Sequence, residues 1–148
     1  MDKIDHQILS DLKENARIKA SDISKNINLS VSSVIERIKK MESNGTIEKY
    51  TITLNQKKMG NDVIVLIEVS LEHPKYYDNF TKTVMANNNI LSCYCVAGDC
   101  DFIIKVVTKS SESLEKIHRE IMSLEGVKST KTNFVFTVVK SELSYLPE

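Results

Sequence analysis

Residues 21–45 hold two helical patterns separated by a three-residue break, and no other stretch constrains the fold as strongly. Residues 20–27 predict one short helix, with isoleucines four apart on one face. A second helix is predicted between a cap at Ser30 and a stop at Gly45. Its inward face is formed by residues spaced four and three apart, which are Val34, Ile38 and Met41.

The outward face of the second helix carries hydroxyl groups at its start and long cations one and two turns later. Small side chains let a helix enter a DNA major groove, arginine can bind a guanine edge or a phosphate, and lysine neutralises backbone charge. The DNA contacts predicted here are Ser30, Ser32, Ser33, Glu36, Arg37 and Lys40. The same pattern also fits an ordinary helical hairpin with a solvated charged face.

The pattern extends over the first 50 residues, through Ile4-Asp5, Ile8-Leu9, Leu12, Asn15-Ala16-Arg17-Ile18, residues 29–34, Arg37, Met41-Glu42, Gly45, Ile47 and Tyr50. In this register the chain closely resembles the N-terminal module of the Lrp/AsnC (feast/famine) transcription regulators of bacteria and archaea. The resemblance favours DNA binding over the ordinary hairpin. It also places Arg17 near the recognition helix, where phosphate contact and pairing with Glu14 or Asp22 are equally open. Asn28 and Ser24 depart from the family pattern, which has glycine and alanine there.

After residue 47 the periodicity changes from helical to alternating. Residues 48–54 predict a connecting strand, and the polar residues 55–61 predict a hinge. Residues 47–61 are therefore expected to link two domains, 1–46 and 62–148.

The second domain predicts the order strand, helix, strand, strand, helix, strand. The expected bounds are 62–71, 75–87, 90–97, 101–108, 111–124 and 127–140. This βαββαβ order is that of a ferredoxin-like sandwich. We therefore expect an α+β protein, with a three-helix, winged-helix-like helix-turn-helix domain followed by a ferredoxin-like domain. The strands are apolar on both faces but helices cover only one, so the other face is expected to pack on another subunit.

Residues 97–102 (Ala-Gly-Asp-Cys-Asp-Phe) combine a glycine with two carboxylates. Taken alone, they fit a hairpin turn, an acid/base pair or a receptor for an ammonium group. They resemble the Gly-Asp-x-Asp turn of the Lrp/AsnC family, which implies a small effector, typically an amino acid, bound between neighbouring dimers. Backbone N–H groups can then bind a carboxylate, while Asp99 or Asp101 accepts from the ammonium group. The effector residues implied are Gly98, Asp99, Asp101, Thr132 and Asn133, of which the last two also fit simple strand pairing.

The formal net charge is zero, and residues 1–50 hold nine Lys/Arg against eight Asp/Glu. One subunit therefore offers a modest phosphate footprint, and useful affinity is expected to need a dimer. A two-fold partner would supply a second recognition helix about one turn of DNA away. The expected partners are double-stranded DNA, a small effector and further copies of the chain, often an octamer in the family.

No basic-then-apolar leader opens the chain, and the longest strongly apolar run, residues 63–67, is too short for a bilayer. A cytoplasmic protein without a membrane partner is expected. Three cysteines close together argue against a disulfide framework, and the three histidines have no partner at ligand spacing. We therefore expect no metal and no cofactor.

Two rival functions fit the same two-domain pattern. One is an enzyme similar to the sirohaem decarboxylases. Its chemistry would require His or Arg side chains around a large tetrapyrrole, and the second domain contains only His73, His118 and Arg119 of these types. The other is a metabolite-sensing assembly module that does not bind DNA. The intact DNA-facing helix favours a regulator whose assembly and DNA binding respond to an effector, and not an enzyme.

Overall fold

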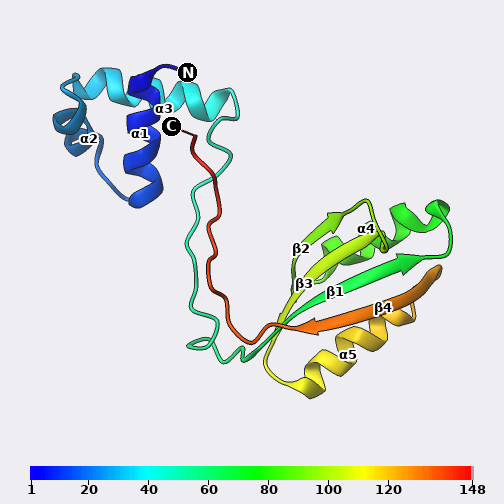
Figure 1. Ribbon diagram of the computed structural model, residues 1–148. Coiled ribbons are helices and arrows are strands. Elements are labelled where there is room, and N and C mark those ends of the chain that lie inside the picture. The colour runs from blue at the N-terminus through cyan, green and yellow to red at the C-terminus, as the bar shows by residue number, and fades with distance from the viewer. Residues whose placement is uncertain (148) are drawn as a thin grey trace. The chain divides into compact units, whose positions relative to one another are not determined.

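The computed structural model describes residues 1–147; Glu148, the last residue of the predicted second domain, lies outside this range. The chain divides into two compact units (Figure 1). Residues 1–53 and 141–147 belong to the first unit, and residues 54–140 to the second. Residues 141–147 therefore group with the helical unit, whereas the sequence placed them in the sheet domain.

Three helices form the first unit, α1 (Lys3–Glu14), α2 (Ala20–Ile27) and α3 (Val31–Ser43). The predicted cap at Ser30 is present in α3, whereas the N-cap of α2, Lys19, forms no side-chain cap hydrogen bond. Asn28 ends α2 in the left-handed conformation, with φ of 58°, which asparagine tolerates better than most residues. Ser30 Oγ accepts the backbone N–H of Ser33 at 3.2 Å and so caps α3. The helices share a core built from one or two residues of each, which are Ile8, Ile23, Val34 and Met41.

The predicted strand over residues 48–54 is wrong, because this segment holds no regular secondary structure. Tyr50 fixes its start by donating from its hydroxyl to Glu42 Oε1 at 2.9 Å, but Ile52 is 77% exposed. An alternating sequence becomes a strand only when another strand completes its hydrogen bonds. Within residues 1–147 no strand pairs with this segment.

The second unit contains a four-stranded antiparallel sheet with the order β2-β3-β1-β4. The strands are β1 (Val63–Leu71), β2 (Ile90–Cys95), β3 (Phe102–Thr108) and β4 (Val127–Phe134). A short 3-10 helix, η1 (Pro74–Tyr76), leads into α4 (Tyr77–Ala86), and α5 (Ser111–Met122) follows β3. Figure 1 shows α4 and α5 along the sheet. The ferredoxin-like βαββαβ prediction is confirmed, although β4 ends at Phe134 and not at residue 140.

The core of this unit lies on the helix-covered face of the sheet. Alternate residues of β1 are buried there, and the Phe80 ring of α4 packs on Phe102 of β3 with ring centroids 4.8 Å apart. The other face is without a helix. Leu66 and Tyr94 on this open face are 38% and 60% exposed, as alternation along the strands requires. None of the helices in the described range has the length and apolar character needed to cross a membrane.

Candidate DNA-binding and effector sites

Helix α3 presents a mixed face to solvent, opposite the buried Val34 and Met41. The exposed residues of its first ten are Val31, Ser32, Ile35, Glu36, Lys39 and Lys40. Three of the predicted DNA contacts, Ser32, Glu36 and Lys40, thus lie on the exposed face. The other three exposed residues were not predicted, although counting helical turns from the buried residues identifies all of them.

The serine hydroxyls at the start of α3 hydrogen-bond to one another. Ser30 Oγ lies 2.7 Å from Ser33 Oγ and 3.1 Å from Ser32 Oγ. Ser30 also serves as the helix cap, and Ser33 is half-buried. Ser32 is exposed and, unlike the exposed Ser30, is not the helix cap, so it is the hydroxyl that a DNA backbone could reach with least rearrangement.

Arg37, predicted to reach a guanine edge or a phosphate, is instead paired within the chain. Its Nη1 donates to Asp2 Oδ2 at 2.8 Å and to Asp5 Oδ1 at 2.7 Å, and its side chain is 31% exposed. The two aspartates lie 35 and 32 residues before Arg37 in the sequence. Packing brings the start of α1 against α3, where the guanidinium joins the two helices. Arg37 is therefore a structural cation in this arrangement.

The three paired groups hold one another ionised. The backbone N–H of Asp5 and then the Arg37 guanidinium lower the pKa of Asp2. Burial by itself would raise the pKa of Asp5, but hydrogen bonds from Arg37 and from the Asp2 backbone outweigh it and lower this pKa. The two carboxylates raise the pKa of Arg37. At neutral pH the trio carries one net negative charge, so it adds no positive potential for DNA.

Other cations of the first unit are available for phosphate contact. Asp22 pairs with Lys25 at 3.4 Å, and the backbone N–H of Arg17 donates to Asn15 Oδ1 at 3.0 Å. In the part of the chain that the structure describes, the Arg17 side chain pairs with neither Glu14 nor Asp22. The cations without an ion pair in residues 1–147 include Arg17, Lys19, Lys39, Lys40 and Lys49.

Asp101, one of the two predicted effector carboxylates, serves the fold. Its Oδ2 accepts the backbone N–H of Leu71 at 2.7 Å, and its Oδ1 accepts the Tyr77 hydroxyl at 2.5 Å. Its own backbone N–H donates to the Val69 carbonyl at 3.0 Å. The Tyr77 hydroxyl and then the Leu71 N–H lower the pKa of Asp101, and the carboxylate raises the pKa of Tyr77 to about 12. Asp101 thereby ties the turn to β1 and α4.

The carboxylate of Asp99, unlike that of Asp101, is available to bind a ligand. It is exposed, and within residues 1–147 its carboxylate makes no hydrogen bond or ion pair to another side chain. Next to it, burial raises the pKa of the Cys100 thiol, and the nearby charges of Glu68, Asp101 and Asp99 raise it further. The turn leads into Phe102, which pairs with Val69, the residue after Glu68 in β1.

The two effector residues predicted on β4 lie on opposite faces of the sheet. Asn133 is opposite Leu66 on the open face, and its Nδ2 donates to Glu68 Oε1 at 2.9 Å. Lys131 pairs with the same carboxylate at 3.4 Å. Thr132 is opposite Ile67, so it faces the helix side. Asn133 and Lys131 are thus brought together at Glu68 on the open face, whereas Thr132 is directed away from them.

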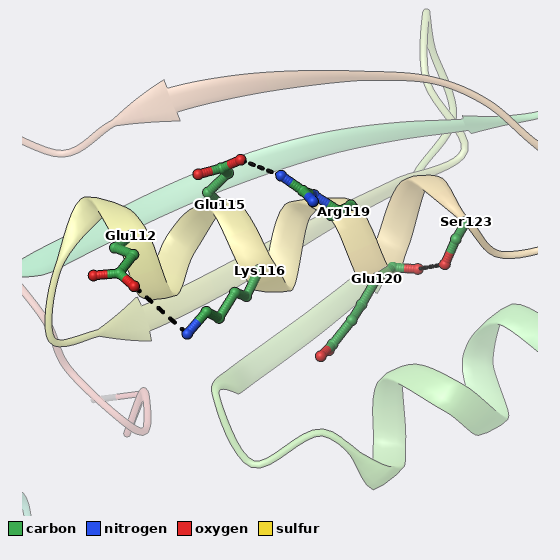
Figure 2. A pocket seen from close by; sticks show the side chains of 6 residues that line it. All are labelled: Glu112, Glu115, Lys116, Arg119, Glu120 and Ser123. Carbon is green, nitrogen blue, oxygen red and sulfur yellow. Dashed lines mark hydrogen bonds and ion pairs between the residues drawn. The ribbon is translucent and has the colours of Figure 1, made fainter.

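A shallow hollow runs along α5, and Figure 2 shows the six side chains around it. They are Glu112, Glu115, Lys116, Arg119, Glu120 and Ser123. Arg119 pairs with Glu115, and Lys116 pairs with Glu112 at 3.7 Å. His118, by contrast, lies 2.9 Å from Thr130 Oγ1 of β4. His118 and Arg119 thus bind different partners, Thr130 of β4 and Glu115 of α5.

Both parts of the chain match known families. Residues 1–48 match the winged helix-turn-helix DNA-binding family, and residues 62–145 match the Lrp/AsnC ligand binding domain. Among relatives, the leucine-responsive regulatory protein of Klebsiella pneumoniae is 31% identical over 95% of this chain and 87% of that protein.

Solved structures agree with the fold. Escherichia coli AsnC superposes with a TM-score of 0.92, at 25% identity and with 99% of each chain covered. A transcriptional regulator from Neisseria meningitidis, solved as a complex with L-Met, gives a TM-score of 0.93 at 24% identity, with 98% of this chain and 96% of that chain covered. With the exposed face of α3 and the ferredoxin-like sheet, these matches establish that the chain belongs to the Lrp/AsnC family of DNA-binding transcription regulators.

Proposed function

We propose that this protein regulates transcription by placing α3 in the major groove at specific operators. The observation that carries the proposal is the division of α3 into two faces. One buries Val34 and Met41, and the other exposes Ser32, Glu36 and Lys40. The cations without ion pairs near α2 and α3, Arg17 among them, supply phosphate contacts on either side of the helix.

The active form is proposed to be at least a dimer. The open face of the sheet exposes Leu66 and Tyr94, and a second copy of the face would remove both from water. The extended residues 48–54 supply a further reason, because a strand of a second copy could satisfy their backbone groups. Two copies would place two recognition helices on successive turns of DNA, and association to an octamer would add further half-sites.

The effector site is proposed at the turn around Gly98 and Asp99, between neighbouring dimers. Asp99 offers a free carboxylate for an ammonium group, and the turn offers backbone N–H groups for a carboxylate. Nothing lies within 4 Å of the space that a Gly98 side chain would fill, so a ligand can approach the backbone there. Asn133 can contribute its amide. An amino acid carries both complementary charges, and the Neisseria meningitidis regulator was solved with L-Met.

Two residues change their proposed role within this site. Asp101 acts by positioning, because Leu71 and Tyr77 already occupy its two oxygens. Thr132 faces the helix side and is assigned to strand pairing. The effector changes DNA binding only to the degree that its affinity differs between assembly states, and DNA must then change effector affinity reciprocally.

The test combines two measurements on the full chain at one protein concentration. Light-scattering mass during size exclusion, with a panel of amino acids, reports assembly, and a salt-dependent mobility shift reports DNA binding. We expect a multiple of the dimer mass that one amino acid alters, and DNA affinity that falls as salt rises. A mass indifferent to every amino acid removes the effector role of Gly98, Asp99 and Asn133. Absence of DNA binding would support the alternative of a metabolite-sensing module. A change in the absorbance spectrum on adding haem would support the alternative of a sirohaem-decarboxylase-like enzyme.

A further inference from the structure

Two β-branched side chains on the exposed face of α3 lie outside the core of the helical unit. Val31 and Ile35 lie four residues apart and so on one side of the helix, and each is 41% exposed. Neither packs in the cluster that holds the three helices together, although their neighbours Leu29 and Ile38 do. β-Branched residues also form helices less readily than alanine or leucine. Neither core burial nor helix stability accounts for the pair.

The residues beside this pair suit the floor of a major groove. Ser32 and Glu36 are next to them in sequence and exposed on the same side, and Lys39 follows one turn after Ile35. In helix-turn-helix proteins, the N-terminal residues of the recognition helix meet the base edges. A carboxylate is repelled by phosphates but accepts well from the N4 amino group of cytosine. The position of Glu36 therefore favours contact with bases over contact with the DNA backbone.

We infer that Val31 and Ile35 are specificity-determining residues that contact thymine methyl groups in the major groove. The C5 methyl of thymine is the apolar group on base edges there, and alanine, threonine or phenylalanine contacts it in known complexes. Glu36 selects a cytosine at a neighbouring base pair. The inference rests on the proposed DNA-binding function and adds to it a preference for particular bases.

The test replaces thymine by deoxyuridine, which removes only the methyl group. Operators are first selected from a random DNA pool with the full chain, and each thymine is then substituted singly in competition binding. We expect uracil to weaken binding by about fourfold at the contacted positions, the effect of exposing about one buried methylene. In Ile35→Ala, uracil at the position that Ile35 contacts should change affinity by less than about twofold, because the alanine side chain has three fewer carbons and contacts less of the methyl group.

Controls separate the inference from the function on which it rests. Alanine at position 35 should keep the helix, since Ile35 is exposed and alanine is the stronger helix former. Met85→Ala, at an 87% exposed position of α4, should keep the full uracil effect.

The possible outcomes are distinct. A wild-type chain that selects no DNA would remove the proposed function itself. Selection with equal affinity for thymine and uracil operators overturns this inference alone. An altered assembly mass in Ile35→Ala with an undiminished uracil effect would assign Ile35 to contact between copies and also overturns it.

Discussion

The Arg37 guanidinium donates to the Asp5 carboxylate at 2.7 Å, and this contact fastens the recognition helix α3 to the start of α1. Asp5 is the most buried of the three charged groups, with its side chain 17% exposed. Asp2 adds a second carboxylate and also caps α1 together with Asp5. The orientation of the DNA-facing surface therefore depends on an ion pair that is not part of that surface.

The first prediction concerns this pair. Arg37→Ala and Asp5→Asn should both lower the thermal midpoint of the helical unit. Arg37→Ala leaves two carboxylates without their cation, and Asp5→Asn removes the more buried of the two carboxylates that bind Arg37. The salt dependence of DNA binding should keep its slope in Arg37→Ala. In Lys40→Ala the slope should fall by about 0.9 in log–log form, since one phosphate contact is lost. Circular dichroism melting and mobility shifts at several salt concentrations measure these effects. A reduced slope in Arg37→Ala, together with an unchanged midpoint, would return Arg37 to the DNA interface.

The second prediction concerns acid. The folded chain lowers the pKa of Asp2, Asp5 and Asp101 below the ordinary value of 3.8. Between the folded and unfolded pKa values the unfolded state binds more protons, so stability falls as pH falls. The contribution of these groups is present above pH 3.8 and is lost progressively below it. Melting from pH 5 to pH 2 should show this loss, and the loss should be smaller in Arg37→Ala. A midpoint that is flat over this range contradicts the prediction.

The partners of these charged groups could not be predicted from sequence patterns. The three helices, the Ser30 cap of α3 and the βαββαβ order follow from patterns within about ten residues, and these were predicted. The roles of Arg37 and Asp101 depend on partners distant in sequence, Asp5 and Tyr77, whose closeness only the fold creates. The strand prediction for residues 48–54 was wrong for the same reason, because a strand is defined by its partner and not by its own alternation.

The candidate site shows the same division. Counting helical turns could have found Ile35 on the exposed face of α3, since the buried positions were already known. The opposite directions of Thr132 and Asn133 also follow from strand alternation, once β4 is placed in register with β1. The register itself is irregular near Ser70 and Leu71, and no local sequence signal gives it.

The third prediction is that two tyrosine hydroxyls lose their protons only at unusually high pH. The bond to Asp101 raises the pKa of Tyr77 to about 12, and burial and Glu42 raise that of Tyr50 to about 12 as well. Two of the five tyrosines should therefore stay protonated at pH 11, roughly one unit above the ordinary tyrosine pKa. Tyr77→Phe should lower the total tyrosinate absorbance at high pH but leave its amplitude at pH 11 nearly unchanged. A fall at pH 11 would mean that the hydroxyl is not held by Asp101.

The same bond stabilises the sheet unit over a defined pH range. Because the folded pKa of Tyr77 is raised, its contribution is fully present below pH 10 and is lost as pH rises toward about 12. Asp101→Ala removes the acceptor for both Tyr77 and the Leu71 N–H, so it should lower the melting temperature more than Tyr77→Phe. Equal effects of the two variants would show that the Leu71 contact contributes nothing measurable.

The last prediction uses two glycines that share a backbone conformation but differ in surroundings. Gly126 has φ of +85°, and a Cβ there would lie 2.1 Å from Tyr76 Cγ and 2.7 Å from its Cβ. Gly60 has φ of +78°, with nothing within 4 Å of that space. Alanine at position 60 should cost about 1 kcal/mol of unfolding free energy from the left-handed conformation alone. Gly126→Ala should cost about 1–3 kcal/mol more, because the atoms it meets lie close to the Tyr76 backbone and cannot swing aside. Urea unfolding of the two variants isolates the overlap, and equal losses would mean that η1 moves away from the turn at little cost.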